Sequence, residues 1–215
     1  SNSDGVWNDV LLDDSTADFT WALILATARR VTEAEQYLRA GNWSGWKLKQ
    51  FLGTDVHHAT LGILGMGRVG QAVARRARGF DMTVLYHNSR RLSAEVEKSC
   101  HAAYVSMDEL LARADILSVH TPYSPATHHI LGAAQFAKMK PGAILINAAR
   151  GGVIDDAALI EALKRGPFGC GGVEDREQEL RLPARSLAAA IEDPVRRRGV
   201  ERQHQRPVPR HGARD

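Results

Sequence analysis

Three glycines in the stretch "LGILGMGRVGQAVARRARGF" have the spacing needed to hold the diphosphate of a dinucleotide. Gly65, Gly67 and Gly70 form G-x-G-x-x-G, directly after an apolar run and at the start of a helical pattern. In such a turn the first glycine permits a tight bend, the second lets the backbone approach a pyrophosphate, and the third lets helix and strand pack closely. An ordinary tight turn is the alternative. The residues expected at the diphosphate are Gly65, Met66, Gly67, Arg68, Val69 and Gly70.

A second group of residues bears on the choice between NAD and NADP. A chain that grips the ribose 2′-hydroxyl usually carries Asp or Glu about 20 residues after the glycines. The stretch "VLYHNSRR" has no carboxylate there, whereas its serine and two guanidinium groups could hold a 2′-phosphate. We therefore expect NADP, with NAD as the second option; arginines that merely face solvent are the alternative. The residues expected at this site are Asn88, Ser89, Arg90 and Arg91.

A lone arginine stands in "ILINAARGGVIDD", residues 144–156, where an apolar run meets a turn of small residues. Arg150 is a cation just after the end of a predicted buried strand. The apolar pattern of that strand does not explain why a charged residue stands there. The histidines at 57–58 and 128–129 form adjacent pairs, and neighbours on an extended chain point to opposite faces. They make poor ligand pairs, so we expect no metal site.

The elements that must position these residues alternate between short β-rich runs and helical patterns. Such alternation predicts an α/β fold, a Rossmann-type doubly wound parallel sheet with helices on both faces. Residues 14–40 read as one long helix, with a cap at Ser15 and an end at Gly41. We expect strands at 60–64, 83–86, 116–119 and 143–146. We expect helices at 68–78, 107–112, 133–138 and 156–164.

The composition changes abruptly near residue 170. The chain has 215 residues, 44% of them hydrophobic, which suffices for one large domain or two small ones. Residues 176–215 carry ten Arg against six Asp or Glu, and every aromatic residue lies at or before Phe168. A segment of this kind buries little apolar surface and tends to stay disordered. We therefore expect residues 171–215 to form an arginine-rich, poorly ordered tail.

The cysteines and the apolar runs bear on where the protein works. Cys100 and Cys170 have no close spacing partner, which argues against a disulfide framework and against a zinc site. The longest apolar run is too short to cross a bilayer, and no basic-then-apolar leader opens the sequence. We expect a cytoplasmic protein with no membrane partner.

Three stretches together resemble the D-isomer-specific 2-hydroxyacid dehydrogenases, and most of all their glyoxylate and hydroxypyruvate reductase branch. They are "GILGMGRVGQAVARRARGFDMTVLYHNSRR", "ADILSVHTPYSPATHHILG" and "MKPGAILINAARGGVIDDAALIEALKRG", and the likeness covers about residues 1–170. The resemblance implies an oxidoreductase that reduces a small 2-keto acid to a D-2-hydroxy acid with NAD(P)H. It also implies a homodimer formed through a long helix like 14–40.

The resemblance assigns roles to residues that match the family's motifs. Arg150 matches the arginine that binds the substrate carboxylate beside the nicotinamide and polarises the neighbouring carbonyl, a catalytic role. A helix-capping or surface arginine is the alternative. By the same likeness, further residues run alongside the cofactor: His120, Thr121, Pro122, Ala148 and Ala149.

The likeness breaks on the proton-donating side. In the family a histidine near the C-terminus protonates the new alkoxide, and a glutamate hydrogen-bonds it. Alignment without gaps places Glu179 at that catalytic glutamate, but neither His204 nor His211 matches the histidine. The resemblance thus divides the chain into a substrate-domain remnant at 1–13, an NAD(P)-binding Rossmann domain at 14–170 and the tail, with most of the flavodoxin-like substrate domain missing.

Three functions stay open from the sequence. The first is the 2-keto acid reductase, and the second is a dinucleotide-binding module without turnover, since the histidine and much of the substrate domain have no match. The third is a nucleic-acid binder through the charge of the tail. The third is disfavoured because the basic residues lack interleaved aromatics and are mixed with acids, so no nucleic-acid partner is expected.

Overall fold

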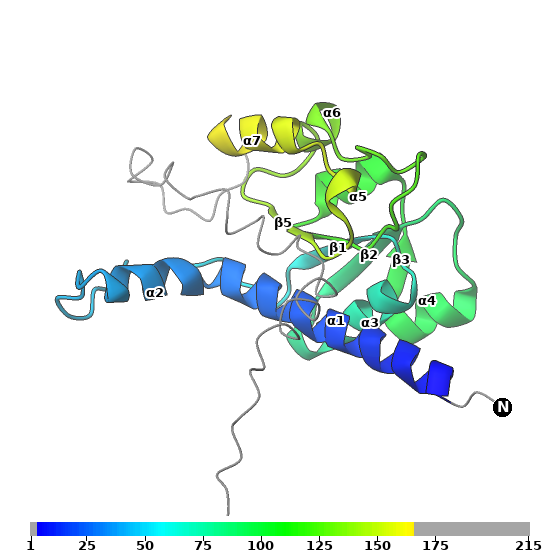
Figure 1. The fold of residues 1–215 in the computed structure, drawn as a ribbon, viewed down its shortest axis with the longest axis horizontal. Helices are drawn as coiled ribbons and strands as arrows, with labels where there is room; N and C mark the ends of the chain where they lie inside the picture. Colours follow the sequence, from blue (N-terminus) through cyan, green and yellow to red (C-terminus); the bar gives the residue numbers. More distant parts are fainter. Residues whose placement is uncertain (1–3, 166–215) are drawn as a thin grey trace, which may run out of the picture.

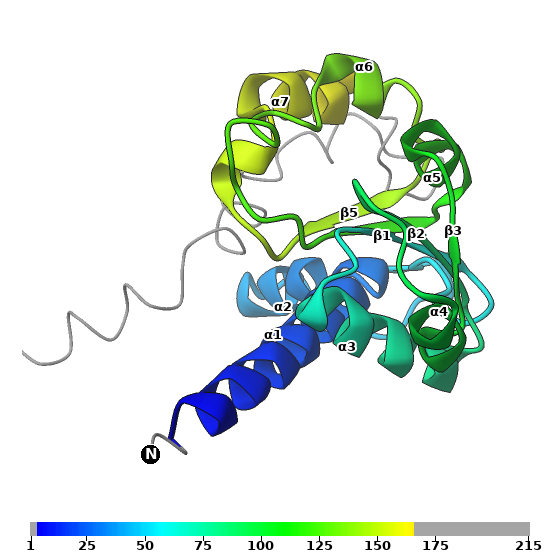
Figure 2. The same cartoon turned by 90° about the vertical axis from the view of Figure 1, so that its right-hand side faces the viewer.

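A five-stranded parallel sheet forms the centre of the computed structural model, which describes residues 4–165. The strand order is β3-β2-β1-β4-β5, and helices cover both faces (Figures 1 and 2). This arrangement confirms the predicted doubly wound α/β fold. The strands are β1 (Thr60–Leu64), β2 (Thr83–His87), β3 (Ala102–Tyr104), β4 (Ile116–Val119) and β5 (Ile144–Asn147).

The helices divide between two layers. One layer holds α1 (Asp4–Ala28), α2 (Val31–Arg39), α3 (Arg68–Ala77) and α4 (Ala94–Cys100). The other holds α5 (Met107–Arg113), α6 (Ala133–Phe136) and α7 (Asp156–Arg165), and Figure 2 shows the two layers above and below the sheet. Strands β4 and β5 are buried along their whole length, which explains why they read as short apolar runs rather than as alternating patterns.

The predicted long helix at 14–40 is wrong in both its start and its continuity. The helix begins at Asp4, so Ser15 lies inside α1 and does not cap it, and Arg30 adopts a left-handed conformation (φ 54°, ψ 38°) that separates α1 from α2. The Thr54 N–H donates to the Ala28 carbonyl at 2.8 Å, so a later loop occupies an acceptor that a continuous helix would use. The break therefore coincides with a long-range contact, and no glycine or proline marks it in the sequence.

Two elements between β2 and β4 were absent from the prediction. Helix α4 and strand β3 are short, and a seven-residue helix followed by a three-residue strand shows too little periodicity to be detected. The Ser93 hydroxyl accepts a hydrogen bond from the Val96 N–H at 3.5 Å and caps α4. Strand β3 pairs with β2 and forms one edge of the sheet.

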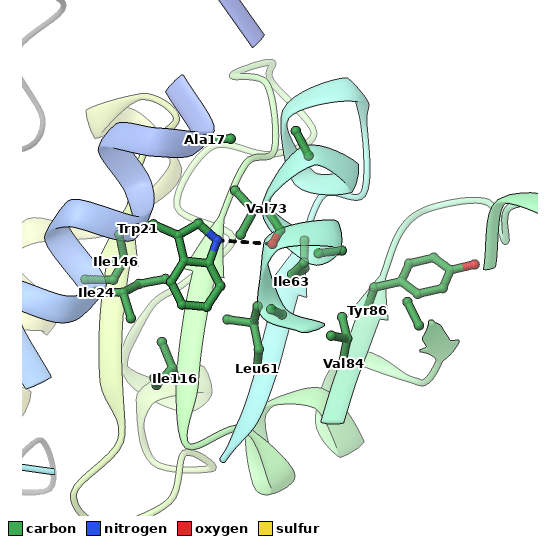
Figure 3. Close-up of a cluster of buried hydrophobic side chains, with 14 of the residues drawn as sticks. Ala17, Trp21, Ile24, Leu61, Ile63, Val73, Val84, Tyr86, Ile116 and Ile146 are labelled. Carbon is green, nitrogen blue, oxygen red and sulfur yellow. Dashed lines mark hydrogen bonds between the residues drawn. The ribbon is translucent and has the colours of Figure 1, made fainter. Parts of the chain in front are cut away.

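The contact between α1, α3 and the sheet forms one half of the core (Figure 3). The Trp21 indole stacks on Phe80 with ring centroids 4.7 Å apart, and its Nε1–H donates to the Val73 carbonyl at 3.1 Å. Ile24 on α1 and Ile146 on β5 belong to the same buried cluster. None of the helices formed by residues 4–165 has the length and apolar character needed to cross a membrane.

Candidate functional site

The carboxyl ends of four parallel strands meet at one edge of the sheet. The register pairs Leu64 with His87 on one side and with Val119 on the other, and pairs Val119 with Asn147. The residues that follow these four carry the site residues expected from the sequence. Because β2 and β3 lie on one side of β1 while β4 and β5 lie on the other, this edge is also the topological switch point, where open α/β sheets bind ligands.

Gly65 makes the bend that leaves β1. Its φ of +97° is in the left-handed region, and its N–H donates to the His87 carbonyl at 3.1 Å. A Cβ at this position would lie 2.6 Å from the Thr121 nitrogen, so a larger residue would collide with the backbone after β4. Gly65 therefore brings the ends of β1, β2 and β4 close together.

Gly67 and Gly70 have opposite surroundings. A Cβ at Gly70 would lie 2.5 Å from the Gly65 carbonyl oxygen, so this glycine lets α3 pack against the turn. A Cβ at Gly67 would meet no atom within 4 Å among the described residues. Gly67 is exposed and precedes the first turn of α3, whose free N–H groups suit an anion. This open approach to the helix terminus is what a diphosphate requires.

The other residues of the turn take different positions. Met66 is buried and Val69 is partly buried against the core, so both side chains pack inward. Arg68 is exposed at the start of α3, and its Nε lies 2.9 Å from Asp13 Oδ2 on α1. The Met66 N–H donates to Asn88 Oδ1 at 2.6 Å, which ties the glycine turn to the end of β2.

The two arginines that follow β2 are not equivalent. The Arg91 guanidinium donates twice to Glu97 on α4, whereas Ser89 and Arg90 are exposed at the tip of the loop. Prediction from the sequence did not include Glu97, because the helix that carries it was itself not predicted. The sequence signal that could have found it is Ser93, a helix-capping residue four positions before Glu97.

His120 follows directly after β4, and its side chain is partly buried. Its Nε2 lies 2.8 Å from the Ser118 hydroxyl oxygen, and its Nδ1 has no hydrogen-bond partner among the described residues. Burial lowers the pKa of the His120 imidazole to about 4, so the ring is neutral at pH 7. Thr121 lies beside it and donates through Oγ1 to the Leu64 carbonyl at 3.2 Å, while Pro122 is exposed.

Asn147 shapes the turn that presents Arg150. Its Nδ2 donates to the Arg150 carbonyl at 3.1 Å, and its Oδ1 accepts from the Ala149 N–H at 3.0 Å. Ala148 is held by its own N–H, which donates to the Val119 carbonyl at 3.2 Å. The Arg150 side chain is exposed, and among residues 4–165 its Nη1 donates only to the Ala149 carbonyl, at 3.0 Å. Asn147 was missed from the sequence, although asparagine at the start of a small-residue turn is a known signal for this contact.

The structure thus brings together the glycine turn, the end of β2, the His120–Pro122 segment and the Arg150 turn on one edge. Glu179 lies outside the described residues. Within residues 4–165, no group of His, Cys, Asp and Glu side chains could hold a metal ion. The chemical character of the edge is a helix terminus and exposed cations, which suits a ligand with several negative charges.

Comparison with known proteins identifies relatives of the chain. The family described as "D-isomer specific 2-hydroxyacid dehydrogenase, NAD binding domain" matches residues 21–190. The chain is 46% identical over 188 residues to glyoxylate/hydroxypyruvate reductase B of Shigella boydii serotype 4, covering 86% of this chain and 58% of that protein. It is 46% identical over 170 residues to glyoxylate reductase of Korarchaeum cryptofilum, covering 79% and 51%.

A solved structure supports the same relationship. The glyoxylate reductase of Paecilomyes thermophila superposes with a TM-score of 0.67 at 44% identity, covering 73% of this chain and 46% of that one. The chain therefore spans about half the length of the relatives it matches, and the part it matches includes the glycine turn and the Arg150 turn.

Proposed function

We propose that this protein reduces a small 2-keto acid to a D-2-hydroxy acid, because the chain belongs to the D-isomer-specific 2-hydroxyacid dehydrogenase family. Relatives named as glyoxylate and hydroxypyruvate reductases support glyoxylate or hydroxypyruvate as the substrate. They favour the reductase over a module that binds dinucleotide without turnover. The observation that carries the proposal is the exposed Arg150. Two hydrogen bonds of the Asn147 side chain fix its turn, which lies at the same sheet edge as the glycine turn.

The glycine turn is built to accept a dinucleotide. A Cβ at Gly65 or Gly70 would collide with neighbouring backbone atoms, whereas a Cβ at Gly67 would meet none of the described atoms. The backbone at Gly67 can therefore approach a diphosphate. When bound, the nicotinamide cofactor supplies the hydride. The first turn of α3 would hold the diphosphate charge, and the backbone of Ala148 and Ala149 and the His120–Pro122 segment would lie beside the cofactor.

Arg150 holds the substrate in this proposal. A guanidinium makes two parallel hydrogen bonds to a carboxylate and so fixes its plane. The keto carbonyl next to that carboxylate is then oriented toward the cofactor, and the same positive charge stabilises the negative charge that develops on its oxygen. Glu179 stays a prediction for the carboxylate that assists proton transfer.

We also propose NADP as the preferred cofactor and a homodimer as the working unit. Ser89 and Arg90 offer exposed donors at the end of β2, where residues 88–91 include no Asp or Glu for a ribose hydroxyl. For the dimer, the support is exposed apolar surface on α2 and the loop after it, including Leu38, Trp46 and Leu48. The cytoplasmic location stays a prediction.

The test is oxidation of NADPH by the purified chain with glyoxylate or hydroxypyruvate, followed at 340 nm. Acetaldehyde, which has the carbonyl but no carboxylate, is the matched control. We expect turnover with the keto acids and a rate at least about a hundredfold lower with the aldehyde, since acetaldehyde has no carboxylate for Arg150 to bind. Absence of turnover with both keto acids, or equal rates with the aldehyde, would contradict the proposal.

A further inference from the structure

Glu97 binds one of the two arginines at the end of β2 and leaves the other open. Arg91 Nε lies 2.8 Å from Glu97 Oε1, and Arg91 Nη2 lies 2.9 Å from Glu97 Oε2. This is the paired geometry in which a guanidinium and a carboxylate satisfy each other. Within residues 4–165, the exposed side chain of Arg90 makes no hydrogen bond or ion pair. The two adjacent arginines thus differ, because Arg91 is paired with Glu97 and Arg90 is available for a ligand.

Glu97 is also bound to the loop through Tyr86. The Tyr86 hydroxyl donates to Glu97 Oε1 at 2.6 Å and accepts from the Leu92 N–H at 3.0 Å. Tyr86 is buried in β2, and Figure 3 shows its ring extending away from Trp21. One carboxylate on α4 therefore holds both the side chain of Arg91 and, through a fixed phenol, the backbone of the next residue.

The charges of this network persist across the pH range in which proteins are stable. Hydrogen bonds from Arg91 and Tyr86 lower the pKa of the Glu97 carboxyl to about 2. Burial and the bond to Glu97 raise the pKa of the Tyr86 phenol to about 12. The carboxylate stays charged and the phenol stays protonated, so the network does not switch near neutral pH.

The other end of the loop is anchored as well. Asn88 accepts the Met66 N–H at 2.6 Å through its side chain, and its carbonyl accepts the Tyr104 hydroxyl at 3.4 Å. Ser89 and Arg90 therefore lie at an exposed tip between two fixed ends. Moving Arg91 onto a phosphate would break its two bonds to Glu97 and leave that carboxylate facing another anion, which is unfavourable.

We propose that Arg90, with Ser89, binds the 2′-phosphate of the cofactor, while Glu97, Arg91 and Tyr86 are positioning residues that hold the loop and do not contact the phosphate. The inference rests on the proposed NADP preference and goes further, because it divides the arginine pair into a ligand and a support. Glu97 acts only through Arg91 and Tyr86.

The test compares Arg90→Ala with Arg91→Ala, which remove the same charge from adjacent positions. Calorimetry measures the Kd of 2′,5′-ADP and of 5′-AMP, which differ only in the 2′-phosphate, at one fixed salt concentration. We expect Arg90→Ala to weaken 2′,5′-ADP roughly 10- to 100-fold, the effect of one lost charged hydrogen bond, and to leave 5′-AMP unchanged. Arg91→Ala should change the ratio of the two Kd values less than about threefold.

Glu97→Gln supplies the readout for positioning. The amide of Leu92 should exchange hydrogen faster in this variant and in Arg91→Ala, but at the parent rate in Arg90→Ala. If Arg91→Ala lowers the 2′,5′-ADP preference as much as Arg90→Ala does, or if the Leu92 amide is unaffected by Glu97→Gln, the division is overturned. A parent chain that binds both nucleotides equally would instead contradict the NADP preference on which the inference rests.

Discussion

Arg150 combines a fixed backbone with an exposed side chain. Asn147 bonds the turn from both sides, so the position of the Arg150 Cα is set while its guanidinium remains available. A residue in this situation contributes little to folding and is suited to hold a ligand.

The first prediction concerns the shape of that cation. Arg150→Lys keeps the charge but loses the planar fork, so kcat/KM for the keto acid should fall roughly 10²–10³-fold. The Kd of NADPH should change less than about twofold, because the glycine turn is untouched. Steady-state kinetics and calorimetry measure the two effects. Arg113→Lys, an exposed arginine paired with Glu109 on α5, is the matched control. Near-normal turnover in Arg150→Lys would show that Arg150 does not hold the substrate carboxylate.

The second prediction concerns His120 and pH. The ring has a pKa of about 4 when folded and 6.5 as its ordinary value, so between these pH values the unfolded chain binds more protons than the folded one. Stability supplied by the neutral ring is therefore complete above about pH 6.5 and is lost as the pH falls toward 4. Between pH 7.5 and 5 the loss attributable to His120 should be about 2 kcal/mol.

Urea unfolding at the two pH values measures this loss. In His120→Gln, the fall in the free energy of unfolding between the two pH values should be smaller than in the parent by that amount. His101→Gln, at an exposed position, should show the same fall as the parent. Equal pH dependence in the parent and in His120→Gln would contradict the assignment.

At the scale of elements, we expect different glycines of the turn to serve folding and cofactor binding. The third prediction is that Gly67→Ala leaves the free energy of unfolding within about 0.5 kcal/mol of the parent, because its Cβ meets open space. The Kd of NADPH should nonetheless rise at least about tenfold, since the proposed site has the diphosphate approach through that space.

Gly70→Ala is the matched comparison, with the opposite expectation for stability. Its Cβ would press on the Gly65 carbonyl, so unfolding should become easier by about 1–3 kcal/mol. Urea unfolding and calorimetry on the two variants decide the matter. A large loss of stability in Gly67→Ala, or none in Gly70→Ala, would show that the roles of the two glycines are misassigned.

These elements also show why some of the fold was predictable and some was not. Strands β1, β4 and β5 are short apolar runs bounded by turns, so local patterns sufficed to find them and the G-x-G-x-x-G turn between them. The break at Arg30 lies beside the contact between Thr54 and Ala28, and the pairing of Arg91 depends on the placement of α4. Contacts between segments distant in sequence leave no local signal, so both were missed.

At the scale of the whole molecule, α2 and the loop after it project from one end of the domain (Figure 1). The loop packs back on the helix through Phe51, whose ring meets Tyr37 edge-on at 5.3 Å. Large apolar side chains nevertheless remain exposed here, with Trp46 at 77% and Leu48 at 73%. A fixed segment with such a surface is suited to meet a second copy of the chain.

The fourth prediction follows from that surface. The parent chain should sediment as a dimer, and Trp46→Glu should raise the dimer dissociation constant at least about tenfold, because a charge would be buried without a partner. Ile160→Glu on α7, which lies in the other helix layer, is the control and should leave the dimer intact. Analytical ultracentrifugation measures both, and a monomeric parent at micromolar concentration would rule out the dimer proposed here.

The packing of α1 against β5 also has a consequence for how the chain is made. Helix α1 leaves the ribosome before the strands that it packs against, so Trp21 and Ile24 find part of their final surroundings only when Ile144 and Ile146 emerge. Throughout that interval the helix carries apolar side chains without their native cover. Helix α1 is thus synthesised before the sheet, but it completes its packing only after β5 has been synthesised.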